Sequence, residues 1–100
     1  MEKEYRTIAQ AAQVELEEKR SRFLGYIQPA ASEEEALAFL ESIRSKHWDA
    51  RHNVYAYRLR EGGRSRYSDD GEPQGTAGMP VLEVLQKKEL CDCVIVVTRY

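Results

Sequence analysis

The chain has 100 residues, a net charge of −2 at pH 7 and a pI near 5.7, so its average charge indicates no polyanionic partner. With 42% hydrophobic and 32% charged residues, it can build one modest core under a well-solvated surface. No run approaches the roughly 20 apolar residues that cross a bilayer, and Met1 does not begin a signal peptide. We therefore expect one soluble domain over residues 1–100, with no membrane partner and a cytoplasmic location.

The first half of the chain predicts two strands and a helix. Val14 and Leu16 alternate with charged residues, as in a half-buried strand, and residues 19–22 form a turn into a second strand over 23–28. Pro29 cannot donate to a ladder and ends that strand. Ser32 and Glu35 form a capping box at the start of a helix. Behind it, one face repeats at helical spacing: Ala36, Leu37, Phe39, Leu40, Ile43 and His47.

The second half predicts a strand, a long loop, a short helix and a central strand. In the strand over 53–59, Val54, Ala56 and Arg58 point one way and Tyr55, Tyr57 and Leu59 the other. A turn follows at 61–64, and Pro80 lies near the start of the short helix. The apolar run 91–98 is typical of a strand covered on both faces. The fold class is therefore α+β, in the order β-β-α-β-α-β with helices on a sheet.

Two cysteines lie within the last apolar run. Cys91 and Cys93 are poorly placed to form a mutual disulfide, because their side chains are two residues apart along a strand. We expect buried, reduced thiols, as in a cytosolic protein, rather than a zinc site or a nucleophile.

Charge is unevenly distributed along the chain. Between residues 44 and 66 there are seven Lys or Arg residues and only two acids, Asp49 and Glu61. This zone could face an anion although the whole chain is acidic. Tyr55, Tyr57 and Tyr67 lie within or beside it, which suits either base stacking or a sheet face covered by a helix.

The loop from Ser68 to Pro80 carries three carboxylates, three glycines and two prolines. Its glycines permit a positive φ or the close approach of a ligand, and the start of the following helix suits an anion. The three acids suit a cation, an arginine or a basic partner instead, and both can hold at different ends of the loop. An ordered turn in which Asp69 and Asp70 cap backbone amides explains the same residues. A catalytic metal is disfavoured because all three acids come from one loop with no His or Cys ligands beside them. His47 is expected to pack or cap its helix, and His52 to make a polar contact at a strand entry.

Read together, these stretches resemble the IMPACT (YigZ-like) family from about Lys19 to Tyr100. The most specific pieces are Ser68-Asp69-Asp70-Gly71-Glu72-Pro73 and Gly75-Thr76-Ala77-Gly78. Residues 19–23, 32–36, 46–47, 50–57 and 97–100 support them, although Val54 stands where the family often has Cys. In the family, a Phe-Gly-Gly motif, a second glycine-rich stretch and, in bacteria, a ferredoxin-like domain follow the Thr-Arg-Tyr motif. We therefore expect an incomplete domain here.

The resemblance implies a fold like the second domain of ribosomal protein S5 and a role in translation. Our leading hypothesis is a regulatory binding protein that binds RNA or the ribosome, or a translation-associated protein, without catalytic residues, metal or cofactor. The alternative is a Mg²⁺-dependent phosphoester or nucleotide hydrolase that uses Asp69 or Asp70. The expected binding residues are Arg22, Arg51, His52, Asn53, Ser68, Asp69, Asp70, Gly71, Glu72, Gly75, Thr76, Gly78 and Arg99.

Overall fold

The structure, a computed structural model, describes residues 12–18, 21–72, 74–75 and 77–100. It contains five strands, two α-helices and one 3₁₀ turn in the described ranges. In chain order these are β1 (Ala12–Glu18), β2 (Ser21–Pro29), α1 (Glu33–Lys46), β3 (His52–Arg58), η1 (Glu61–Gly63), β4 (Ser65–Ser68), α2 (Gly78–Lys87) and β5 (Cys93–Arg99). In this part of the chain, no helix combines the length and apolarity needed to span a membrane.

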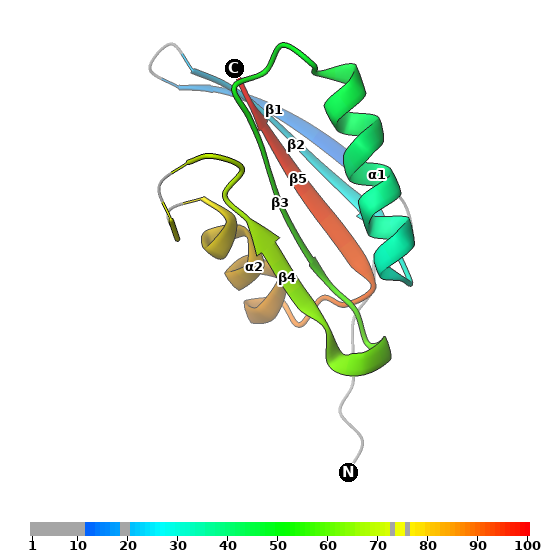
Figure 1. The fold of residues 1–100 in the computed structure, drawn as a ribbon. Coiled ribbons are helices and arrows are strands. Elements are labelled where there is room, and N and C mark those ends of the chain that lie inside the picture. Colours follow the sequence, from blue (N-terminus) through cyan, green and yellow to red (C-terminus); the bar gives the residue numbers. More distant parts are fainter. Residues whose placement is uncertain (1–11, 19–20, 73, 76) are drawn as a thin grey trace.

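The strands form one sheet in the order β1-β2-β5-β3-β4, and every neighbouring pair is antiparallel. The two helices lie on opposite faces, α1 on one and α2 on the other (Figure 1). Strand β5 is central, as its apolar sequence predicts, because β2 and β3 both pair with it. The α+β class is confirmed, whereas the likeness to ribosomal protein S5 stays a prediction.

The predicted element order is wrong at one point, since β4 follows β3 directly as a hairpin. Residues 61–64 do turn the chain, with Gly62 and Gly63 at positive φ and the Leu59 amide donating to the Arg64 carbonyl at 2.8 Å. Four residues then pair with Tyr55–Arg58 of β3. Sequence patterning missed β4 because it is short, polar and largely exposed, so it carries no alternating apolar signal.

Helix α1 begins where the capping motif predicts. Ser32 has extended backbone angles, and its hydroxyl accepts the Glu35 amide at 3.2 Å. The Glu35 carboxylate accepts the Ala31 amide at 2.7 Å, one residue before the cap. Acidic residues fill the first turn and basic residues the last, which complements the helix dipole.

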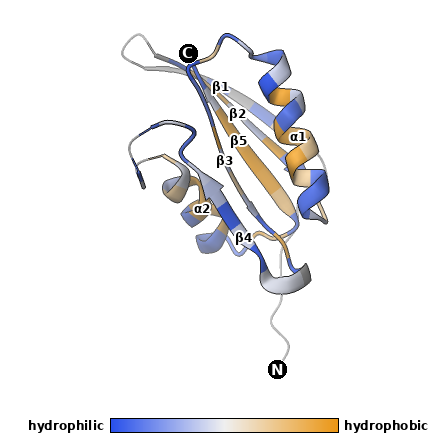
Figure 2. Ribbon diagram, in the orientation of Figure 1, coloured by the Kyte–Doolittle hydropathy of each residue, from blue (hydrophilic) through white to orange (hydrophobic). Residues whose placement is uncertain are grey.

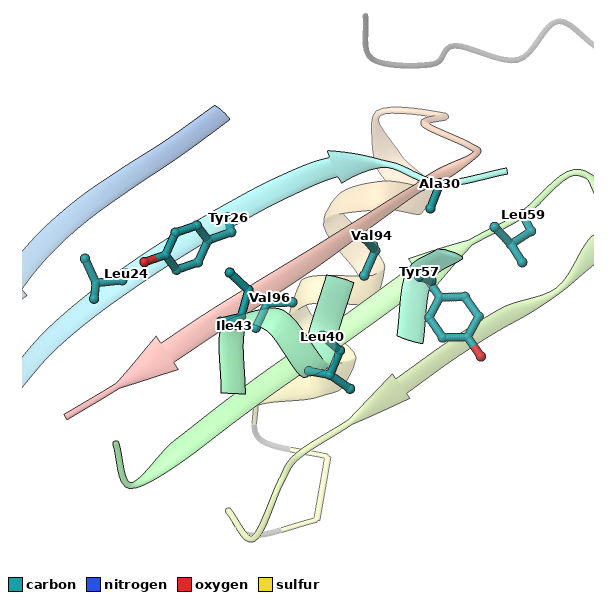
Figure 3. Packing of buried hydrophobic residues seen from close by; sticks show 10 residues of the cluster. Leu24, Tyr26, Ala30, Leu40, Ile43, Tyr57, Leu59, Val94 and Val96 are labelled. Carbon is teal, nitrogen blue, oxygen red and sulfur yellow. The ribbon is translucent and has the colours of Figure 1, made fainter. Parts of the chain in front are cut away.

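The main core lies between α1 and the sheet (Figure 3). Leu40 and Ile43 of α1 belong to one buried cluster with Val94 and Val96 of β5. Figure 2 shows β5 as the most continuous hydrophobic strand of the sheet. Tyr57 joins this core at 3% exposure, and its hydroxyl donates to Glu33 Oε2 at 2.6 Å. Burial and this bond raise the pKa of Tyr57 to about 12.

The other face of the sheet is covered only in part. Helix α2 contacts β3 and β4, and its Leu82 and Leu85 are buried with Ala56 and Cys93. Farther across the sheet an apolar hollow of about 410 Å³ remains between β2, β5 and α2. The prediction that β5 is covered on both faces therefore holds at Cys93 but not fully at Ile95 and Val97, which line the hollow.

Gly78 sets how closely α2 approaches β4. A Cβ at this position would lie 2.6 Å from the Ser68 carbonyl oxygen and 2.8 Å from Tyr67 Cδ2. The first contact is with backbone, which cannot rotate away, so only glycine fits without a shift of the helix.

We expect Gly78→Ala to destabilise the fold. A glycine-to-alanine change inside a helix normally gains about 0.5–1 kcal/mol, but overpacking costs about 1–3 kcal/mol, so the clash should prevail. Denaturant unfolding measures the difference, with Glu83→Ala on the exposed side of α2 as the control. A Gly78→Ala variant at least as stable as the parent would contradict this packing.

Candidate functional site

The loop after β4 folds back onto the start of β3 through Asp70. The Asn53 amide donates to Asp70 Oδ2 at 2.6 Å, and the Asp70 amide donates to Ser68 Oγ at 3.1 Å. His52 Nδ1 lies 2.6 Å from the Asp70 carbonyl oxygen, which can only accept, so Nδ1 carries the proton. These contacts hold Asp70 at a φ of +46°. Aspartate tolerates this left-handed conformation better than most residues do.

Gly71 continues the same tight turn. Its φ is +90°, and a Cβ there would lie 3.4 Å from two ring atoms of His52. A side chain at this position would therefore be strained by the backbone and crowded by the imidazole. The Asp-Gly pair allows the loop to reverse against β3.

Asp69 organises the rest of the loop and the start of α2. Its Oδ2 accepts the Gly75 amide at 2.8 Å, and its Oδ1 accepts the amides of Ala77 at 3.1 Å and Gly78 at 2.7 Å. The hydrogen bonds from these backbone amides lower the pKa of Asp69. The ordered, capped turn is therefore the correct alternative, and the expectation of an external anion is wrong at these amides. Thr76 lies outside the described residues.

Glu72 and Arg99 link the loop to the end of β5. Arg99 Nη1 donates to Glu72 Oε1 at 2.6 Å, and His52 Nε2 lies 3.7 Å from the same oxygen. The Arg99 guanidinium also lies over the Phe23 ring, with 5.9 Å between its Cζ and the ring centroid. Its buried Nε has no partner within the described part of the chain. Through its bond to Glu72, Arg99 ties the end of β5 to the loop.

The structure brings most of the predicted site residues together, but they face one another. Asn53 is only 7% exposed, and its side-chain oxygen accepts the Thr98 hydroxyl at 2.7 Å. Arg51 is different: its amide donates to the Arg99 carbonyl at 2.9 Å, while its side chain is exposed and has no ion pair among the described residues. Arg22 lies on β2, the strand next to β5, and its Nε is 2.8 Å from Glu15 Oε1. Binding by this set stays a prediction.

The acidic side chains of the loop are engaged by other groups of the described part of the chain. The carboxylates of Asp69, Asp70 and Glu72 all accept bonds or pair with cations of the protein. No cluster of three His, Cys, Asp or Glu residues in these ranges has a geometry for a metal. Cys91 and Cys93 are both free and buried, as expected, and burial raises the pKa of Cys93 to about 11. A thiol in that state is a weak nucleophile.

The basic segment divides into two groups rather than forming one surface. Arg60 pairs with Asp92 at 2.8 Å and Arg64 with Glu33 at 3.4 Å, at the hairpin end of β3. Arg44, Lys46 and Arg51 lie near the opposite end of β3. The two ends of this strand are about 20 Å apart, because a strand rises roughly 3.3 Å per residue. Arg44 bridges α1 and the loop, with its Nη2 3.5 Å from Asp70 Oδ1. Sequence reasoning missed this link because only the tertiary fold brings the two segments together.

His47 ends α1 in a buried chain of hydrogen bonds. Tyr26 Oη lies 2.6 Å from Nε2, and Tyr100 Oη lies 2.6 Å from Nδ1 and 3.3 Å from Asp49 Oδ1. A neutral imidazole satisfies this chain if Tyr26 donates to Nε2, Nδ1–H donates to Tyr100, and Tyr100 donates to Asp49. The predicted packing and capping role of His47 is confirmed.

The tyrosines of β3 are not available to stack on bases. Tyr57 is buried and Tyr55 is partly buried against the same α1-side cluster. The two rings stack on each other, with centroids 6.3 Å apart and planes within 6°. The alternative of a sheet face covered by a helix is therefore correct for this pair.

Comparison with known proteins places this site in a family. The Impact N-terminal domain model matches residues 19–100. The chain belongs to the IMPACT family. It is 43% identical over 97 residues to IMPACT family member YvyE of Bacillus subtilis, covering 96% of this chain and 45% of that relative. It is also 41% identical over 85 residues to IMPACT family member YigZ of Escherichia coli, covering 82% and 42% respectively.

A solved structure shows the same fold. A crystal structure of a hypothetical protein matches 92% of this IMPACT family chain at a TM-score of 0.87 and 39% identity. The match covers 46% of that protein. The chain thus spans about half the length of the relatives it matches.

We expect Asp69→Asn to loosen the loop and the start of α2. An amide cannot offer two acceptor oxygens, so one of the three backbone donors would face an NH₂ group. The variant should show a lower Tm and faster proteolysis within residues 68–80 than Glu83→Gln. Its remaining stability should also fall less in acid, because the lowered pKa of Asp69 gives stability above its unfolded pKa that is lost as pH falls. Unchanged proteolysis would contradict this role.

We expect His47 to make the fold less stable in mild acid. Burial, together with Lys46 and Arg22, lowers the pKa of His47, although Asp49 opposes this. The unfolded state, with a pKa near 6.5, therefore binds the proton first, and stability present above that pH falls as pH drops through the folded pKa. The free energy of unfolding between pH 8 and 5 should fall less steeply in His47→Leu than in the parent. Equal slopes would contradict this assignment.

Proposed function

We propose that this IMPACT family chain is a non-catalytic binding module in translation that docks on ribosomal RNA. One observation carries the proposal: the loop carboxylates are neutralised from within the protein, while cations at the same end of β3 stay exposed. The site thus offers a fixed shape and positive charge instead of a reactive group.

The internal contacts of the loop support docking over hydrolysis. A catalytic base or a magnesium ligand needs a carboxylate oxygen that is free to meet water or metal. Asp69 accepts three amides, and Asp70 accepts the Asn53 amide and lies near Arg44. Using either residue for catalysis would cost the contacts that hold the loop.

The exposed cations supply the part that can contact phosphate. Lys46 and Arg51 have no acidic partner among the described residues, and both side chains are exposed. Arg22 and Arg44 lie at the same end of the molecule, although each pairs with an acid. Lys and Arg contacts to phosphates give affinity and position without reading sequence, which suits a protein that binds the RNA backbone.

This proposal narrows the role expected of Arg99. The sequence predicts both Arg51 and Arg99 as binding residues, but Arg99 Nη1 donates to Glu72 and its guanidinium lies over the Phe23 ring. We therefore assign Arg99 to holding the loop and Arg51 to contacting the partner.

We expect Arg51→Ala to weaken association with ribosomes. Affinity measured by co-sedimentation between 50 and 200 mM salt should fall, and the slope of log K against log salt should become shallower by roughly one phosphate contact, about 0.7–0.9. Arg66→Ala is the matched control, because Arg66 is an exposed arginine on β4 at the other end of β3.

Two outcomes would reject the proposal. The first is a ribosome affinity and salt slope that are the same in the parent, Arg51→Ala and Arg66→Ala. The second is association that survives nuclease digestion of the RNA, which would assign the module to a protein partner instead.

A further inference from the structure

Trp48 is an exposed aromatic side chain without cover from the described residues. It is 83% exposed, against 49% for Val84, 39% for Leu37 and 37% for Tyr67. It is also the single tryptophan of the chain. An isolated apolar residue on a surface needs no explanation in itself. Trp48 differs from such a residue because it lies on a hydrogen-bonded turn near exposed Lys46 and Arg51.

The backbone that carries Trp48 is held firmly. His47, the preceding residue, is 8% exposed and bound on both ring nitrogens by Tyr26 and Tyr100. The Ala50 amide closes the turn by donating to the His47 carbonyl at 3.0 Å. The following Asp49 accepts from Tyr100 at 3.3 Å. The exposed indole therefore lies on a hydrogen-bonded turn that follows α1. The connection from α1 into β3 can be followed in Figure 1.

Cations flank this turn on both sides. Lys46 lies two residues before Trp48, with its Nζ 5.6 Å from the centre of the Tyr26 ring. Arg51 lies three residues after it and is exposed. The Arg22 guanidinium lies 5.6 Å from the centre of the Tyr100 ring, which itself contacts His47. Asp49 is the opposing charge at the turn, and the carboxyl end of α1 adds a partial negative charge that Arg44 and Lys46 offset.

An exposed indole on a hydrogen-bonded turn, with exposed Lys46 and Arg51 close to it in sequence, fits an unpaired nucleotide. Single-stranded nucleic acid offers base faces for stacking and phosphates at regular spacing for Lys and Arg. In duplex RNA the bases are stacked on one another and cannot meet an indole. A protein partner would use an exposed tryptophan as an apolar anchor, but anchors of that kind favour desolvated surroundings depleted of lysine.

We propose that Trp48 is a stacking platform for a base of single-stranded RNA, with Lys46 and Arg51 on the flanking phosphates. This inference rests on the proposed docking on RNA and adds which form of RNA is bound and which side chain meets the base. Tyr57 is buried, Tyr55 is partly buried and Tyr67 is 37% exposed, so Trp48 is the most exposed of these aromatic side chains.

Fluorescence emission of Trp48 can report base stacking directly, because it is the single tryptophan of the chain. We expect a single-stranded RNA oligonucleotide to quench Trp48 emission in the 100-residue chain, while a duplex of equal length and inorganic polyphosphate quench it weakly. Trp48→Ala should weaken binding of the oligonucleotide, measured by anisotropy of an RNA label, by roughly 5- to 150-fold. Trp48→Phe should recover part of that loss. Val84→Ala, at an exposed apolar residue of α2, is the matched control and should bind as the parent does.

The outcomes separate this inference from the proposed function. If Trp48→Ala binds the oligonucleotide as the parent does while Arg51→Ala weakens ribosome binding, the stacking platform is rejected and RNA docking stands. If neither free RNA nor ribosomes bind the parent chain, both are rejected. If ribosome association survives nuclease yet still requires Trp48, the residue contacts a protein and the RNA inference is overturned.

Discussion

The contacts that Asp69 and Asp70 make with backbone amides are the constraint on which the rest of the site depends. Asp70 ties the loop to the start of β3, and Asp69 ties it to the start of α2. Asp69 accepts three backbone amides, and these hydrogen bonds favour its charged form and lower its pKa. The two aspartates therefore fix the shape of the loop through bonds with the backbone of the protein itself.

That fixed loop gives the molecule one distinctive end. There, the start of β3, the end of β5, the end of α1 and the loop meet, held by Arg99 to Glu72 and by Arg44 to Asp70. The His47 chain fixes the neighbouring turn in the same way, with Tyr26 and Tyr100 on either side of the imidazole. Lys46 and Arg51, whose exposed side chains have no acidic partner among the described residues, lie near this end.

Several sequence inferences held because they depend on local physics. The capping box at Ser32, the alternation in β3 and the apolar run of β5 each reflect hydrogen bonding or burial within a few residues, so each predicted its element correctly. The motifs within Ser68–Gly78 indicated the IMPACT family from the sequence alone, and the family model matches residues 19–100. Strand β4 was not predicted, because its pairing with β3 rather than its own composition makes it a strand.

The sequence by itself determined the α+β class, the family and the buried thiols, whereas binding by the predicted site residues stays a prediction. Only the tertiary structure decided what each site residue does, because a carboxylate reads the same in a sequence whether it faces solvent, a metal or a backbone amide. It assigned Asp69 and Asp70 to the loop, buried Asn53, tied Arg99 to Glu72 and divided the basic segment between the two ends of β3. Such pairings join residues far apart in the chain, and their geometry is set by how helices and strands pack rather than by residue type.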